Sequence, residues 1–175
     1  MNCENSILIH APLETIFAVT SNLENWPNVL PHYRWIHVLS RNGDAMTVKM
    51  AARCGWLPIQ WTSRFQADAE ARELRFHHLK AFTRGMVVKW TFTPTANGVL
   101  VQISHELHRR SAPARWFAEQ ILAKQFIQPV ASRTLRCFKQ LLECGPAVAG
   151  SPPSSTGKAR IHAPAAGKSP RSPKP

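Results

Sequence analysis

Six consecutive segments in the middle of the chain alternate apolar and polar residues, which is the pattern of strands with one buried face. The connections between them are short, and those at residues 42–44 and 97–98 carry the turn sequences NGD and NG. Strands joined so closely pair as antiparallel neighbours. The pattern therefore predicts an antiparallel sheet built from residues 35–41, 45–53, 58–68, 73–80, 85–94 and 98–109.

A further strand and helix are predicted before this sheet. Residues 5–11 alternate, and Pro12 then begins a helical pattern with Leu13 and Ile16 on one face. The connection that follows, LENWPNVLPHYRW at residues 23–35, is rich in aromatic rings and holds two prolines that restrict its backbone. One or two short helices are expected between the first strand and the sheet.

The last periodic segment predicts a long amphipathic helix. Ser111 is its expected N-cap, and Gly145 follows its end. Pro129 lies inside the segment and is expected to bend the helix, because proline removes one backbone donor and crowds the preceding turn. One face of the helix is apolar and suits the apolar face of a sheet. That face consists of Phe117, Ile121, Phe126, Val130, Cys137 and Leu141.

The order of elements predicts an α+β fold in which a curved antiparallel sheet of about seven strands wraps around the long C-terminal helix. A chain of 175 residues suits one hydrophobic core. Residues 1–144 are predicted to form this domain. Residues 145–175 hold seven of the 14 prolines and no apolar periodicity, so we expect a disordered basic tail there.

The net charge of +12 raises the question of a nucleic-acid partner. Five of the cations lie in the acid-free tail, and the others are scattered singly along the chain. We therefore predict no DNA partner, while RNA or an anionic membrane surface remains open for the tail. The cysteines at positions 3, 54, 137 and 144 form no C-x-x-C pair, so reduced thiols, no metal and no cofactor are expected.

The sequence also predicts where the protein resides. No apolar run approaches the roughly 20 residues that span a bilayer. The amino end, MNCENSILIHAPLE, lacks the basic start and apolar run of an export signal. We therefore expect a soluble cytoplasmic protein.

Alternation assigns the inner face of most strands, although residues 33–40 allow two assignments. In that strand Trp35, His37 and Leu39 compete with Ile36 and Val38. The other strands each give one apolar side. Their inner residues are Met46, Val48, Met50 and Ala52; Ile59, Trp61, Phe65 and Ala67; Leu74, Phe76 and His78; Met86, Val88, Trp90 and Phe92; and Val99, Val101, Ile103, His105 and Leu107.

Two histidines, His78 and His105, fall on this otherwise apolar inner face. They are either core histidines that hydrogen-bond a neighbour, or, together with Ser63, the few polar groups of a ligand pocket. Both are candidate catalytic acids or bases, because the unperturbed pKa of histidine lies near neutrality.

The tryptophans and methionines of the inner face either fill a core or line a cavity for an apolar or aromatic ligand. Arg53 and Arg84 lie at strand ends, where a cavity mouth would be. They are either solvated or able to bind an anionic or carbonyl-bearing headgroup. The candidate ligand-binding residues are Met50, Trp61, Ser63, Phe65, Phe76, Arg84, Met86, Trp90 and Ile103.

Residues 7–39, residues 76–107 and the final helix together resemble the START-like, polyketide cyclase/dehydrase superfamily, whose fold is the helix-grip. The resemblance implies a deep cavity between sheet and final helix that holds polyketides, ubiquinone or lipids. It also implies that residues 25–33 lie beside the cavity mouth. Trp26 and Leu30 would then wedge the sheet against the helix, with His32 and Tyr33 near the entrance.

Three functions are compatible with these features. The first is a carrier of a hydrophobic small molecule, which requires only a cavity. The second is a polyketide aromatase/cyclase or dehydratase that folds a poly-β-ketone, with His78 or His105 moving a proton and Arg84 or Arg53 polarising a carbonyl. The third is an RNA- or ribosome-associated protein that uses the basic surface and tail.

Overall fold

The computed structural model describes residues 1–81, 83–107, 113 and 124–145. Its seven strands form one antiparallel sheet in the order β1-β7-β6-β5-β4-β3-β2. The predicted α+β architecture and the antiparallel pairing of consecutive strands from β2 to β7 are confirmed. The strands are β1 (Asn2–Ile9), β2 (Tyr33–Asn42), β3 (Ala45–Cys54), β4 (Leu57–Asp68), β5 (Glu73–His78), β6 (Val87–Thr95) and β7 (Gly98–Glu106).

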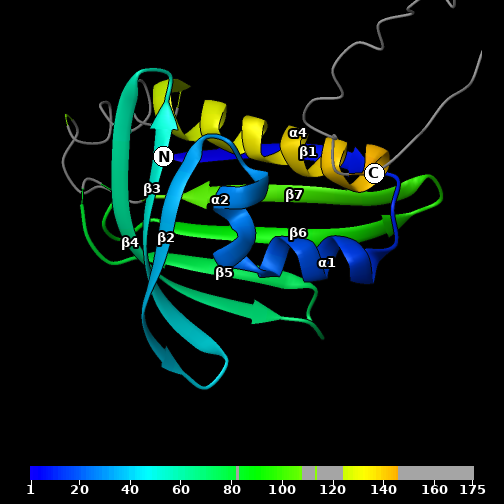
Figure 1. Ribbon diagram of the computed structural model, residues 1–175, viewed down its shortest axis with the longest axis horizontal. Coiled ribbons are helices and arrows are strands. Elements are labelled where there is room, and N and C mark those ends of the chain that lie inside the picture. Colours follow the sequence, from blue (N-terminus) through cyan, green and yellow to red (C-terminus); the bar gives the residue numbers. More distant parts are fainter. Residues whose placement is uncertain (82, 108–112, 114–123, 146–175) are drawn as a thin grey trace, which may run out of the picture.

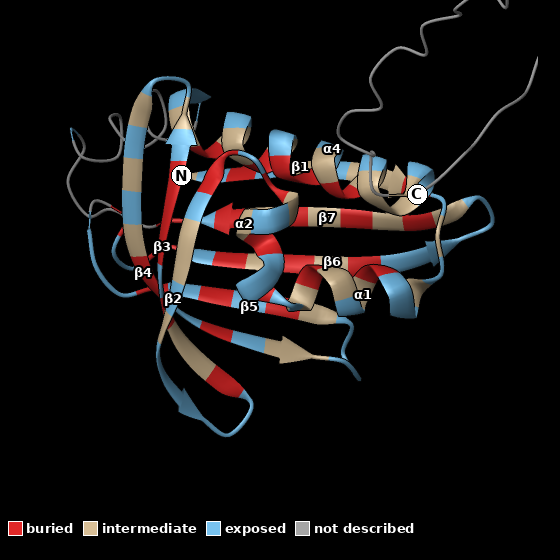
Figure 2. Cartoon of the chain, viewed as in Figure 1, coloured by how far each residue is buried: buried red, intermediate tan, exposed pale blue. Residues whose placement is uncertain are grey.

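The helices lie together on the inner face of this curved sheet (Figure 1). They are α1 (Leu13–Ser21), the 3₁₀ turn η1 (Leu23–Asn25), α2 (Trp26–Val29) and α4 (Gln128–Cys144). Buried residues alternate with exposed or half-buried ones along β5, β6 and β7 (Figure 2), as the period of two predicts. The core therefore lies between the sheet and the helices. No helix in the part of the chain that the structure describes is long and apolar enough to cross a membrane.

The final helix is described only over its second part. Residues 124–127 form a π-helical turn that continues directly into α4 at Gln128. Pro129 lies in the first turn of α4, directly after the π-helical turn. This position suits proline, because a first-turn N–H has no partner within the helix. Ser111, Phe117 and Ile121, which were part of the prediction, lie outside the described residues, as do residues 146–175 of the predicted tail.

The structure also decides the inner face of β2. Ile36 and Val38 pack against the core, whereas the rings of Trp35 and His37 stack on the outer face with centroids 4.5 Å apart. Register shifts follow Tyr33 and Val38. Each shift adds a residue to one strand and reverses which parity faces inward. Alternation alone therefore gave two answers for this strand.

Trp26 explains the aromatic connection between α1 and β2. Its side chain is 2% exposed, and its indole N–H donates to the Thr20 carbonyl at 3.0 Å. Its ring lies 5.1 Å from that of Tyr33, 5.6 Å from that of Trp90 and 5.7 Å from that of Phe138, measured between centroids. These partners belong to β2, β6 and α4. Trp26 is thus a wedge between the sheet and the final helix.

Candidate ligand-binding site

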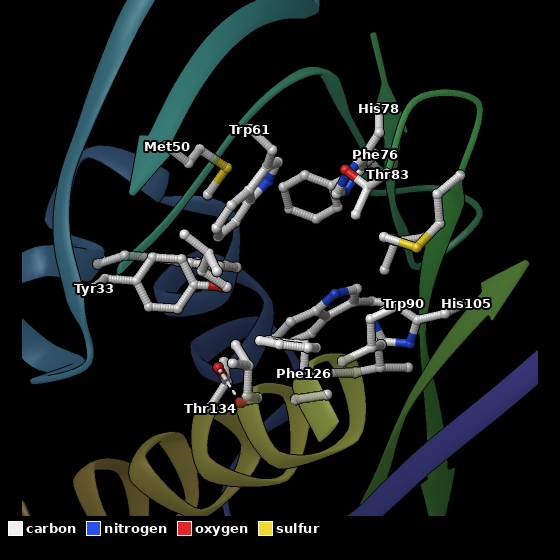
Figure 3. A pocket seen from close by; sticks show the side chains of 18 residues that line it. Tyr33, Met50, Trp61, Phe76, His78, Thr83, Trp90, His105, Phe126 and Thr134 are labelled. Atoms are coloured by element: carbon white, nitrogen blue, oxygen red, sulfur yellow. Dashed lines mark hydrogen bonds between the residues drawn. The ribbon is translucent and has the colours of Figure 1, made fainter. Parts of the chain in front are cut away.

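A cavity of about 90 Å³ remains between the inner face of the sheet and the first turns of α4 (Figure 3). Apolar side chains form most of its wall, and none of its lining residues is Asp, Glu, Lys or Arg. The lining residues are Trp26, Tyr33, Met50, Ile59, Trp61, Phe76, His78, Thr83, Met86, Val88, Trp90, Ile103, His105, Phe126, Ile127, Val130, Ala131 and Thr134.

The volume of the cavity limits its guest. A void of roughly 150 Å³ lined by apolar side chains accepts benzene, and drug-sized ligands occupy pockets of roughly 300–1,000 Å³. A cavity of about 90 Å³ is smaller than both. The cavity is therefore present but small. A ligand of several fused rings can enter only if the cavity walls move apart.

One side of the cavity carries the two predicted histidines. The Nδ1 atom of His78 lies 2.7 Å from the Thr83 hydroxyl, and its ring lies parallel to Trp61 with centroids 6.0 Å apart. The Nδ1 atom of His105 is buried and has no hydrogen-bond partner within the described residues. The structure therefore brings both side chains to one cavity, with one nitrogen of His105 unpaired.

Burial sets the charge of this pair. It lowers the pKa of His78 to about 3, with smaller contributions from His105 and His77, and it lowers the pKa of His105 to about 4. Both imidazoles are consequently neutral at pH 7. A neutral imidazole offers one N–H donor and one nitrogen acceptor.

A second polar group lies across the ring-lined cavity from His78 and Thr83, where Figure 3 shows Tyr33 and Thr134. Thr134 donates its hydroxyl proton to the Val130 carbonyl at 2.9 Å, so its oxygen accepts from Nε2 of His32 at 2.8 Å. Burial raises the pKa of the Tyr33 phenol above its usual value, and a hydrogen bond with Thr134 partly opposes the change. The cavity thus has uncharged polar groups at two ends and aromatic rings between them.

The predicted ligand-binding residues divide into two sets. Six of them line the cavity: Met50, Trp61, Phe76, Met86, Trp90 and Ile103. Ser63 and Phe65 are fully buried on β4 but do not line it, and the Ser63 hydroxyl has no hydrogen-bond partner in the described chain. Arg84 and Arg53 are exposed and also lie outside the lining.

Sequence reasoning missed several polar lining residues. Thr83 follows β5 in a loop without periodicity, and Thr134 was left out of the predicted apolar face of the helix. Tyr33 was placed near the entrance only by the family resemblance. The helical period did contain a usable signal, because Phe126 and Val130 of the predicted face line the cavity.

Comparison with known proteins identifies the family. The model of the family described as "Polyketide cyclase / dehydrase and lipid transport" matches residues 9–133. The chain belongs to this family. A relative from Streptomyces halstedii that carries the name "Putative polyketide cyclase" is 29% identical over 105 residues, which cover 57% of this chain and 94% of the relative. The resemblance noted from the sequence is therefore confirmed.

Solved structures extend the polyketide cyclase/dehydrase assignment to the fold. The Zhui aromatase/cyclase from Streptomyces sp. R1128 superposes with a TM-score of 0.65 at 14% identity, covering 83% of this chain and 98% of that chain. A START superfamily protein from Mycobacterium smegmatis gives a TM-score of 0.58 at 16% identity, covering 80% of this chain and 98% of that chain. The helix-grip fold expected from the sequence is thus confirmed.

Proposed function

We propose that this protein binds an uncharged hydrophobic small molecule in the cavity between sheet and α4, and acts as its carrier. The observation that carries the proposal is the lining, in which aromatic rings separate two uncharged polar ends and no ionised side chain occurs among the lining residues. An ion without a partner is costly to bury, so such a wall favours a neutral guest. Family membership supports a hydrophobic ligand.

The polar ends narrow the ligand class. The imidazoles of His78 and His105 can donate to a carbonyl oxygen or accept from a hydroxyl, and the Tyr33 phenol can do the same on the other side. The rings between them suit a flat apolar body. A polyketide, a quinone or a lipid with a small oxygenated headgroup has this chemistry, whereas a free carboxylate or phosphate does not.

Filling the cavity should abolish binding. Ala131 lies on the cavity-facing side of α4 and is 5% exposed, so the ring of Ala131→Phe is directed into the free space. We expect wild-type protein to bind 2-naphthol more tightly than the charged 2-naphthoate, and Ala131→Phe to weaken 2-naphthol binding at least about tenfold. Isothermal titration calorimetry measures both affinities.

The matched control places the same ring on the other side of the helix. Gln140 is exposed on α4, so Gln140→Phe leaves the cavity unchanged and should bind 2-naphthol as the wild type does. Equal affinity for the two naphthalene probes, or no binding of either, would contradict the proposal. A shared loss in both phenylalanine variants would show that the cavity is not responsible.

The second candidate function is polyketide cyclisation, which the two neutral imidazoles facing one cavity favour. Burial lowers the pKa of His78 to about 3 and that of His105 to about 4, which makes both imidazoles weak bases, so proton abstraction by either is the less effective route. A neutral imidazole N–H instead donates to the carbonyl oxygen of a folded poly-β-ketone and stabilises the enolate that forms there. Orientation in the cavity supplies the rest of the acceleration.

This candidate predicts that histidine variants lose turnover while they keep ligand. Removing one donor to a developing oxyanion typically costs about a hundredfold or more in rate. We therefore expect His78→Ala or His105→Ala to lower turnover of a poly-β-ketone thioester about a hundredfold, with 2-naphthol affinity changed only a few-fold. His77→Ala is the control, because His77 neighbours His78 but is exposed. If the wild-type protein does not turn over the thioester, the cyclase function is contradicted and the carrier function is retained.

The RNA-associated alternative depends on the basic tail. Residues 146–175 lie outside the described part of the chain, so this alternative and the cytoplasmic location stay predictions.

A further inference from the structure

The strand connections divide the sheet into two ends. The β3–β4 turn, the β5–β6 loop and the π-helical turn before α4 lie at the cavity end, because Ile59, Thr83 and Phe126 line the cavity there. The Cys54 thiol donates to the Gln125 carbonyl at 3.2 Å, and this hydrogen bond joins the β3–β4 turn to the π-helical turn. We call residues 53–58, 79–81, 83–87 and 124–127 the cavity rim. The β2–β3, β4–β5 and β6–β7 turns lie at the opposite end.

Exposed apolar side chains gather at the cavity rim. Four large hydrophobic side chains are exposed within the described residues, and three of them belong to the rim: Trp56 at 90%, Val87 at 41% and Leu79 at 37%. The fourth, Leu39 at 57%, lies on β2 toward the opposite end. Single exposed apolar residues are ordinary, but three of these four lie on the rim of one cavity, which makes the rim the candidate interaction surface.

Trp56 is presented by a tight turn that does not require it. Cys54 and Leu57 are the last paired residues of β3 and β4, so the loop has two residues, and Gly55 has a φ of +62°. Glycine at the first loop position with positive φ is typical of a type II′ hairpin turn, which matches the twist of the strands. The second position accepts polar residues equally well. Folding therefore gives no reason for a solvated indole at this tip.

The rim is also basic. Arg53, Lys80 and Arg84 are exposed there. No acidic residue occurs in residues 45–67 or in residues 74–105, which include the hairpin and the β5–β6 loop. Four acidic residues lie in or beside the turns at the opposite end, at Asp44, Asp68, Glu70 and Glu73. One exposed acidic residue, Glu106 on β7, pairs with Val87 of the rim, so the three rim cations outnumber it.

We propose that the cavity rim, with Trp56 as its anchor, docks on the surface of an anionic lipid bilayer. Tryptophan is enriched at the interface between membrane and water, because its ring is apolar and its N–H is polar. Exposed Lys and Arg are attracted to anionic headgroups. Docking in this way places the cavity beside the bilayer, so an apolar ligand enters or leaves without crossing water.

The spacing of the apolar side chains favours a membrane over an acidic protein as partner. The backbone N–H of Leu79 donates to the Thr62 carbonyl at 2.8 Å, and Trp56 lies six residues before Thr62 along β4. At about 3.3 Å per residue, the tip is roughly 20 Å from Leu79. A fluid bilayer receives separate anchors at any spacing, whereas a folded partner needs a matching pocket for each.

Vesicle binding tests the proposal on the full chain. We expect the protein to co-sediment with vesicles of phosphatidylcholine and phosphatidylglycerol, but weakly with phosphatidylcholine alone, and the binding to fall at 0.5 M salt. Trp56→Ser should weaken binding to the anionic vesicles about tenfold. Leu39→Ser, which removes an exposed apolar side chain toward the opposite end, should leave it unchanged. The basic tail is present in every variant, so the difference between the two variants belongs to the rim.

The outcomes separate this surface from the proposed ligand function. Trp56→Ser should still bind 2-naphthol with wild-type affinity, because Trp56 does not line the cavity. Wild-type protein that ignores anionic vesicles, or Trp56→Ser that binds them as the wild type does, would overturn the proposal. A Trp56→Ser variant that still binds the vesicles but no longer binds an acidic protein would assign the rim to a protein partner instead.

Discussion

Replacing Trp26 with alanine is expected to destabilise the protein by about 3–5 kcal/mol. Trp26 is almost fully buried and contacts rings from β2, β5, β6 and α4. Its removal leaves a large void at the point where the sheet meets the final helix, and leaves the Thr20 carbonyl without its indole donor. Because total stability is typically about 5–15 kcal/mol, a large share is lost. Urea unfolding followed by circular dichroism measures the change.

Two further variants keep this prediction testable if Trp26→Ala does not fold. Trp26→Phe retains a ring but not the N–H donor, and should cost about 1–3 kcal/mol. Trp35→Ala removes a tryptophan from the outer face, where its ring stacks on His37, and should cost less than about 1 kcal/mol. Similar losses for the inner and outer tryptophan would show that Trp26 is not the wedge.

Acidification should destabilise the protein through the cavity histidines. Histidine in an unfolded chain has a pKa of about 6.5, whereas burial lowers the pKa of His78 to about 3 and of His105 to about 4. Below pH 6.5 the unfolded chain therefore binds protons that the native protein does not. At about 1.4 kcal/mol per pH unit and proton, the expected loss between pH 7 and pH 5 is about 2 kcal/mol for each histidine.

Unfolding free energies at pH 7 and pH 5 test this linkage. The double variant His78→Gln/His105→Gln should lose about 4 kcal/mol less on acidification than the wild type does. His32, whose pKa burial also lowers to about 4, keeps contributing in both proteins. His37→Gln removes an exposed histidine and should retain the wild-type slope. A double variant with the wild-type slope would mean that the pair is not held neutral by the fold.

The arrangement of the sheet was largely predictable from the sequence, because a period of two specifies faces wherever one face is buried. The inner assignment of Val48, Leu74, Trp90 and Val101, for example, needed nothing else, and all four are buried. The same rule placed His78 and His105 on one face. The period of two could not predict that both histidines face one cavity, because this depends on how the strands between them pair and curve.

What could not be predicted depends on local irregularity. The register shifts in β2 turn Tyr33 and Ile36 to the same side despite their opposite parity, and no residue pattern marks the positions of those shifts. Thr134 lies four residues after Val130, so the helical period placed it on the cavity-facing side of α4, and only its polar side chain kept it out of the predicted apolar face. Spacing does not show which polar groups of distant elements meet it there, such as His32 and Tyr33.

The place of β1 in the sheet has a consequence for how the chain acquires its structure. Within the described residues β1 pairs with β7 alone. The helix α4 holds it through hydrogen bonds from Asn5 to Ser132 at 2.8 Å and from Lys139 to the Leu8 carbonyl at 2.6 Å. β1 therefore waits for its partner strand until nearly the whole domain has been synthesised. Such distant partners slow folding, because the entropy of a long loop is lost before its contacts form. Until β1 pairs with β7, the nascent chain is most prone to aggregate.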